Sequence, residues 1–131
     1  MKYLVMIYGN PRNWEHPMFL HDPGFLALPA EERAELVRQA EELRREVAET
    51  GEFVAGVALA DPALTKSVRG QDGVPVTTDG PYVEAKEQLA GYFVFDCESQ
   101  ERALELASRF PDARFAGLEV RPIMDMAGQE M

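Results

Sequence analysis

The sequence has few of the residues and patterns on which several classes of protein depend. Cys97 is the only cysteine among 131 residues, so no internal disulfide can form. No apolar run approaches the ~18 residues of a membrane-spanning helix. The N-terminus also lacks the charged and apolar layout of a signal peptide. We therefore expect a single cytoplasmic domain that covers residues 1–131.

Basic residues are also scarce. The chain has 13 Lys and Arg against 23 Asp and Glu, which gives a formal net charge of −10. Nucleic acids and anionic membranes are bound by clustered Lys and Arg, and the sequence contains no such cluster. We therefore expect neither as a partner. The 46% of apolar residues is typical of a globular protein with a real core.

Hydrophobic patterns and turn residues predict an α+β fold. Apolar runs of strand length alternate with two segments in which apolar residues recur every three or four positions, as on one face of a helix. Asp72-Gly73 stands between two short extended runs and indicates a β-hairpin. The predicted elements are a strand (3–8), a helix (29–50), a strand (53–59), the hairpin (65–69 and 74–78), a strand (89–97), a helix that begins after Ser99 and ends before Pro111, and a strand (115–124).

This order is that of a ferredoxin-like, split βαβ domain with an inserted β-hairpin. Two helices cover only one face of a four-stranded sheet, yet the strands at 3–8 and 89–97 are apolar on both faces. A second copy of the sheet would cover the other face, so we expect a homodimer. The segment 9–28 is the alternative cover and would allow a monomer. Residues 125–131 have few apolar anchors and are expected to form a flexible tail.

The segment 9–28 is irregular in pattern but rich in aromatic residues. Proline and glycine interrupt it, while Trp14, Phe19 and Phe25 must pack against something. It can be a lid over a cleft or a plug at the edge of the core. It also holds both histidines, His16 and His21.

One stretch of ten residues, 78–87, concentrates charge around a turn. It contains three carboxylates, one ammonium group and the dipeptide Gly80-Pro81. Glycine accepts a positive φ, and proline restricts both its own φ and the conformation of the residue before it. We therefore expect a sharp turn that presents Asp79, and then Glu84 and Lys86, beside the apolar strand that follows.

This stretch begins a set of residues that resembles the signature of the DGPF proteins, a branch of the YCII-related superfamily. The set is Asp79-Gly80-Pro81-Tyr82, Glu84, Lys86-Glu87, Leu89 and Gly91, with Tyr82 where the family usually has Phe. Residues 2–8 and 119–122 agree as well, so the resemblance covers nearly the whole chain. It implies a dimeric α+β barrel. YCII-type relatives also have a His–Asp pair in a cleft, whereas most of the family has no assigned activity.

The candidate catalytic residues are Asp79 and His21. Asp79 can act as a general base, or it can be a turn residue whose side chain bonds the following backbone amides. His21 can be its partner in proton transfer, or a solvent-exposed loop residue. The candidate ligand-binding residues are Lys86, Glu84, Arg121 and Tyr82. Arg121 can hold an anionic ligand, or it can pair with Glu119 or with the carboxylates of the stretch 78–87.

No metal or cofactor is expected. The sequence lacks the His-x-His, Cys-x-x-Cys and His-Glu-x-x-His spacings of metal sites, and it has no glycine-rich phosphate loop. Cys97 lies at the end of an apolar strand and is expected to be an inert packing residue.

Three functions are compatible with these features. The first is a small-ligand-binding or regulatory module, because DGPF relatives resemble companions of alternative sigma factors; its partner would be a sigma factor or another basic protein. The alternative is a cofactor-independent acid/base enzyme, an isomerase or a lyase of the dehydrochlorinase type, acting on a small acidic or aromatic molecule. In the third, the signature residues have a purely structural role: they fold the turn and bind no ligand.

Overall fold

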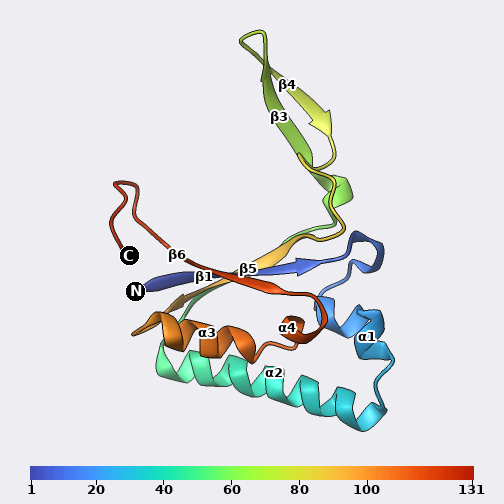
Figure 1. Cartoon of the computed structure of the whole chain (residues 1–131), viewed down its shortest axis with the longest axis vertical. Coiled ribbons are helices and arrows are strands. Elements are labelled where there is room, and N and C mark those ends of the chain that lie inside the picture. Colours follow the sequence, from blue (N-terminus) through green and yellow to red (C-terminus); the bar gives the residue numbers. More distant parts are fainter.

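A computed structural model describes all 131 residues and places a four-stranded sheet on a layer of helices (Figure 1). All strand pairs are antiparallel and the order is β2-β5-β1-β6. This is the ferredoxin-like topology that the sequence predicts, with the hairpin inserted between β2 and β5. The sheet strands are β1 (Lys2–Gly9), β2 (Phe53–Ala58), β5 (Gln88–Asp96) and β6 (Leu118–Pro122); the two long helices are α2 (Ala30–Thr50) and α3 (Gln100–Ser108).

The core lies between the sheet and the two long helices. On β1, Tyr3 and Val5 point toward the helices and are 1% and 0% exposed. They pair across the strands with Phe95 and Phe93 of β5. Burying such a side chain stabilises the fold by ~1.5–3 kcal/mol, so this face of the sheet holds the domain together. The other buried members of the cluster are Leu43, Val47, Cys97, Ala103, Leu106 and Ala107.

Local signals in the sequence set the ends of both long helices. Pro29 occupies the cap position before α2, and Gly51 ends that helix with a φ of 79°. Ser99 precedes α3, and its hydroxyl accepts a hydrogen bond from the backbone N–H of Arg102 at 3.1 Å. These boundaries confirm the predicted ones.

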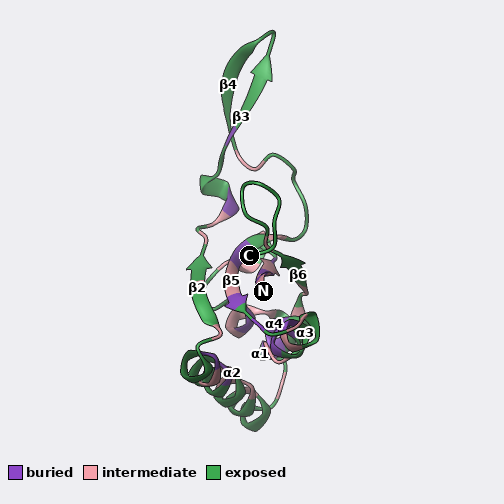
Figure 2. Ribbon diagram, turned by 90° about the vertical axis from the view of Figure 1, so that its left-hand side faces the viewer, coloured by how far each residue is buried: buried purple, intermediate pink, exposed green.

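The inserted hairpin forms an arm that stands away from the rest of the molecule (Figures 1 and 2). Its strands are β3 (Lys66–Gln71) and β4 (Val74–Asp79). The turn is Asp72-Gly73, as predicted, with φ angles of 52° and 79°. Positive φ at both positions matches the right-handed twist of the flanking strands. Figure 2 shows the arm exposed along almost its whole length.

The segment 9–28 packs as a plug and also borders a cavity described below. It forms two 3₁₀ turns, Pro11–Asn13 and Met18–His21, and a one-turn helix α1 (Pro23–Leu26). Phe25 lies edge-to-face against Phe19 and Phe115, with ring centroids 5.4 and 5.8 Å apart. Phe115 ends the short helix α4 (Asp112–Phe115), so the prediction that the last strand starts at this residue is wrong. Its ring packs on Phe25 and not along the sheet.

The face of the sheet opposite the helices is largely apolar. Leu4 and Val94 pair across β1 and β5 on this face, beside Met6, Tyr8 and Tyr92. All five are buried or half-buried in the single chain. The arm projects on this same side (Figure 1).

The C-terminal segment returns to the start of β1. Met124 and Glu130 form an isolated β-bridge, and the N–H of Ile123 donates to the Lys2 carbonyl at 2.9 Å. The Asp125 carboxylate accepts hydrogen bonds from the N–H groups of Ala127 and Gln129. The flexibility of residues 125–131 stays a prediction. No helix has the length and apolar character needed to cross a membrane.

Candidate functional site

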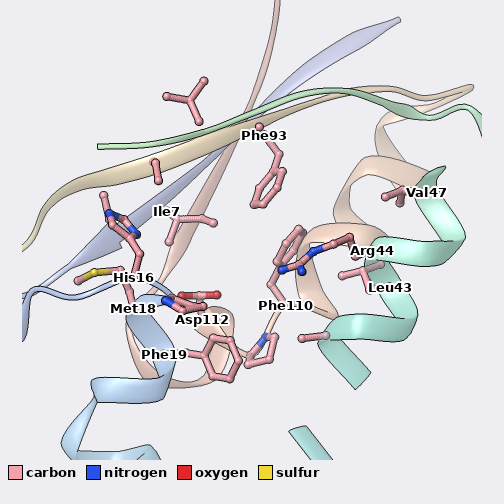
Figure 3. A pocket seen from close by; sticks show the side chains of 18 of the residues that line it. Ile7, His16, Met18, Phe19, Leu43, Arg44, Val47, Phe93, Phe110 and Asp112 are labelled. Atoms are coloured by element: carbon pink, nitrogen blue, oxygen red, sulfur yellow. The ribbon is translucent and has the colours of Figure 1, made fainter. Parts of the chain in front are cut away.

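A cavity of about 510 Å³ opens between α2 and the helix-facing side of the sheet. Residues of the segment 9–28 and of the α3–α4 turn close one end of it (Figure 3). Most of the lining is apolar, and only three of the lining side chains can carry charge: His16, Arg44 and Asp112. The apolar walls include Leu43 and Val47 from α2, Phe93 and Phe95 from β5, and Phe110, Met18 and Phe19.

Small residues on both walls leave this space unfilled. On the sheet, Gly56, Ala58, Ala90 and Gly91 line the cavity, and Ala40 and Ala48 line it on α2. At Gly56, an added Cβ would lie 3.0 Å from the Phe93 ring, which is closer than ordinary contact. Because protein interiors otherwise pack densely, a space of this size beside the core is a candidate ligand site.

Asp112 is the buried acid of the cavity. It is the first residue of α4, directly after Pro111, and is only 8% exposed. Burial raises its pKa from 3.8 to about 6, because the charged form loses its hydrating water. The negative charge of nearby Asp22 also raises this pKa, by a smaller amount. Its own backbone N–H and His16 favour the charged form. Asp112 therefore titrates close to neutral pH.

His16 lies at the mouth of the cavity and is held by the chain that leaves β2. Its Nε2 is 2.6 Å from the carbonyl oxygen of Leu59. A carbonyl only accepts, so we assign the hydrogen to Nε2, and Nδ1 remains as the nitrogen that can take up a proton. Trp14 supports this geometry: its indole N–H donates to the same carbonyl, and its ring meets the imidazole edge-on.

The structure does not bring the two predicted catalytic residues together. Asp79 ends β4 on the arm, where its side chain is 87% exposed and forms an ion pair with Lys66. His21 lies in the segment 9–28, with its Nδ1 3.5 Å from the Glu15 carboxylate. Neither residue lines the large cavity. A catalytic role for Asp79 and His21 stays a prediction that the single chain does not support geometrically.

One of the four predicted ligand-binding residues lines a cavity together with Asp112. Lys86 lines a smaller cavity of about 170 Å³, which shares Asp112, Met18 and Phe19 with the large one. Glu84 and Tyr82 are exposed in the turn after β4. The guanidinium of Arg69 lies over the Tyr82 ring, 4.1 Å from its centroid.

Arg121, the fourth, is on the opposite face of the sheet from the large cavity. It is exposed on β6, and no ion pair joins it to Glu119. The pKa of the Tyr8 hydroxyl on the neighbouring strand is raised, mainly by the Glu119 carboxylate and to a smaller extent by burial. Arg121 therefore belongs to the surface expected to meet a second copy, away from the cavity.

No group of three or more His, Cys, Asp or Glu side chains converges to hold a metal ion. Cys97 is buried in the core, and burial raises the pKa of its thiol. A thiol that stays protonated is unreactive, which agrees with the predicted packing role.

Sequence reasoning missed both Asp112 and Arg44. Asp112 follows a proline at a helix boundary, where the usual role of Asp is to bond backbone amides, so its residue type gives no sign of burial. Arg44 had a readable signal. It is one turn after Ala40 and one turn before Ala48, next to the apolar stripe of α2. A charge at that position lies at the edge of the surface that the stripe packs against.

The fold and this cavity define a ferredoxin-like α+β domain with a large apolar pocket beside its core. The chain belongs to the YCII-related family, whose model matches residues 1–127. The narrower resemblance to the DGPF proteins stays a prediction.

The proteins that are similar to this chain include a relative from a bacterium and a protein of solved structure. An uncharacterised protein, R00369, from Rhizobium meliloti (strain 1021) is 30% identical over 95 residues, which are 71% of this chain and 77% of the relative. A 5-chloro-2-hydroxyhydroquinone dehydrochlorinase (TftG) from Burkholderia phenoliruptrix AC1100, solved with 2,5-dihydroxybenzoquinone, is 13% identical. Its TM-score is 0.42, and the match covers 99% of this chain and 100% of that one.

Proposed function

We propose that the protein binds a small, mainly apolar molecule in the cavity beside α2 and transfers a proton to or from it through Asp112 and His16. One observation carries this proposal: a carboxylic acid that is 8% exposed, with a pKa raised to about 6, in the wall of a mainly apolar cavity. A general acid or base works best when its pKa is near the working pH, and burial brings Asp112 there.

The two groups suit a reaction that needs no cofactor. In an isomerisation, the Asp112 carboxylate takes a proton from one atom of the ligand, whose bonding electrons stay on the ligand as a shifted double bond. Protonated His16 then returns a proton to a second atom. In an elimination, the same electrons expel a leaving group with its electron pair. Both schemes balance without an oxidant or a co-reactant.

The size of the cavity limits the ligand. A cavity of ~150 Å³ is enough for benzene, and this one measures about 510 Å³. It therefore has room for a substituted one-ring or two-ring molecule, within the range of ordinary ligand pockets. This agrees with the predicted small acidic or aromatic ligand.

Thermal shifts with a panel of small carboxylates and phenols test the proposal. A ligand that binds only the folded protein raises its melting temperature. Above pH 6 we expect a shift in the wild type that Asp112→Asn increases, because an apolar ligand then no longer desolvates a carboxylate, and that the matched variant Asp79→Asn leaves unchanged. The opposite pattern, with the shift altered only in Asp79→Asn, would move the site to the arm and refute the proposal.

We also propose that the protein is a homodimer in which the helix-free faces of two sheets pack together. The apolar side chains of that face, Leu4, Met6, Tyr92 and Val94, support this arrangement. A second copy would bury the part of their surface that is still exposed, at ~25 cal/mol per Å² of apolar surface. The arm of each chain, which projects on that side, would then reach along its partner (Figure 1).

Protein recognition is a second candidate function, and the arm favours it. Val68 and Val74 on the arm, and Leu64, Tyr82 and Val83 beside its base, are all at least 60% exposed. An isolated two-stranded hairpin is at best marginally stable in water, so a partner would stabilise it. A sigma factor or another basic protein stays a predicted partner. Replacing residues 66–79 by a short glycine-serine loop would abolish such binding and leave the cavity ligand unaffected.

A further inference from the structure

Arg44 places a positive charge at the apolar cavity without a protein partner. Three other arginines in or next to the two long helices are paired: Arg38 with Glu35 and Glu42, and Arg102 and Arg109 with Glu46. Arg44 takes part in no ion pair, in a chain that has 23 acidic residues. A free guanidinium beside apolar walls offers its planar donors to an anionic ligand.

Arg44 lies at the opposite end of the cavity from the proton-transfer pair. Figure 3 shows its guanidinium turned from α2 toward Phe110, whereas His16 and Asp112 lie with Met18 and Phe19 on the other side. Arg44 is also absent from the groups that influence the pKa of Asp112. The cavity therefore has a cationic end and a proton-transfer end, separated by apolar side chains.

We propose that the ligand is an apolar, ring-containing monocarboxylate whose carboxylate binds Arg44. Its body then fills the space between Phe93, Phe110 and Val47, and its far end reaches His16 and Asp112. This orientation keeps the ligand's negative charge away from the Asp112 carboxylate, where like charges would repel. The inference rests on the proposed function, because it assumes that the cavity is the ligand site.

The experiment compares two probes of the same shape, 2-naphthoate and its neutral amide, 2-naphthamide. Their affinities are measured by calorimetry for the wild type, Arg44→Gln and Arg45→Gln. Arg45 is the matched control, because it is an exposed arginine on the same helix, forms no ion pair and does not line the cavity. Chemical shifts of the Gly56 and Gly91 amides show whether each probe enters the cavity.

A charged hydrogen bond contributes ~1.5–3 kcal/mol, so Arg44→Gln should weaken naphthoate binding by about 10- to 100-fold. Naphthamide binding should change by less than about twofold, which also shows that the cavity of the variant is intact. Arg45→Gln should leave both affinities unchanged. Equal losses in the two variants would mean that only net charge matters, and would overturn the assignment.

The same measurements distinguish a failure of the Arg44 assignment from a failure of the proposed function. If both probes shift the Gly56 and Gly91 amides but bind equally well with or without Arg44, the cavity is the ligand site and only the Arg44 assignment is refuted. If neither probe shifts those amides, the cavity does not bind ring-shaped ligands, and the proposed function is refuted together with the carboxylate inference.

Discussion

Gly91 of β5 faces the carbonyl oxygen of Val57 on β2 so closely that no side chain fits between them. A methyl group at this position would overlap that oxygen and push the edge strand away from β5. The same glycine lines the cavity. The last residue of the signature set thus has a physical reason to be glycine: it lets two strands approach and keeps the cavity open.

We predict that Gly91→Ala lowers the free energy of unfolding by ~1–3 kcal/mol, the usual range for overpacking. Urea unfolding measures this change. Gly70→Ala is the matched control, because nothing lies within 4 Å of an added Cβ at that strand position on the arm. Equal effects of the two substitutions would show that the close approach to Val57 does not limit residue 91.

Replacing the buried acid is predicted to stabilise the protein above neutral pH. Burial raises the pKa of Asp112 from 3.8 to about 6, so between these values the native state binds its proton more tightly than the unfolded chain. The contribution of Asp112 to the free energy of unfolding is therefore greatest at low pH. It falls as pH rises from about 4 to about 6 and stays lower above that. The loss is on the order of 3 kcal/mol.

Asp112→Asn removes this pH-dependent cost. Its free energy of unfolding should match that of the wild type near pH 4 and exceed it by up to ~3 kcal/mol near pH 8. Asp79→Asn, at an exposed position, should show no such gain. Urea titrations of the three proteins across this pH range provide the comparison. If Asp112→Asn is less stable than the wild type near pH 8, the Asp112 carboxylate is not desolvated and this prediction is wrong.

The proposed dimer depends on the apolar face opposite the helices. Val94 lies on the central strand β5 and pairs with Leu4, so a charge there would be buried between two sheets. We predict that Val94→Glu sediments as a monomer, whereas the wild type and the control Leu104→Glu, at an exposed position of α3, sediment as dimers. A wild type that is monomeric at every concentration would refute the proposed interface.

The sequence predicts the order of strands and helices because each depends on local patterns. The continuous apolar runs of β1 and β5, the hairpin at Asp72-Gly73 and the end of α2 at Gly51 all follow from a few neighbouring residues. The last strand shows the limit: Phe115 continues its apolar pattern, yet the ring is held by Phe25, which is distant in the sequence.

The candidate site was less predictable, because its charged residues come from three separate parts of the chain. The charged turn at 78–87 favours Asp79, which the structure places on the arm, and the adjacency of His21 and Asp22 favours His21, which does not line the cavity. Only folding brings His16 and Asp112 to one cavity. Burial, which gives Asp112 its altered pKa, is a tertiary property that residue type alone does not encode.

The pKa of Asp112, measured by carboxyl-carbon NMR with and without 2-naphthol, is the decisive measurement for the proposed proton-transfer site. We expect a value of about 6 in the free protein. We expect a higher value with the probe bound, because an apolar molecule in the cavity displaces water from the carboxylate. A value near the ordinary 3.8, unchanged by the probe, would mean that Asp112 is solvated and that the cavity is not a site of proton transfer.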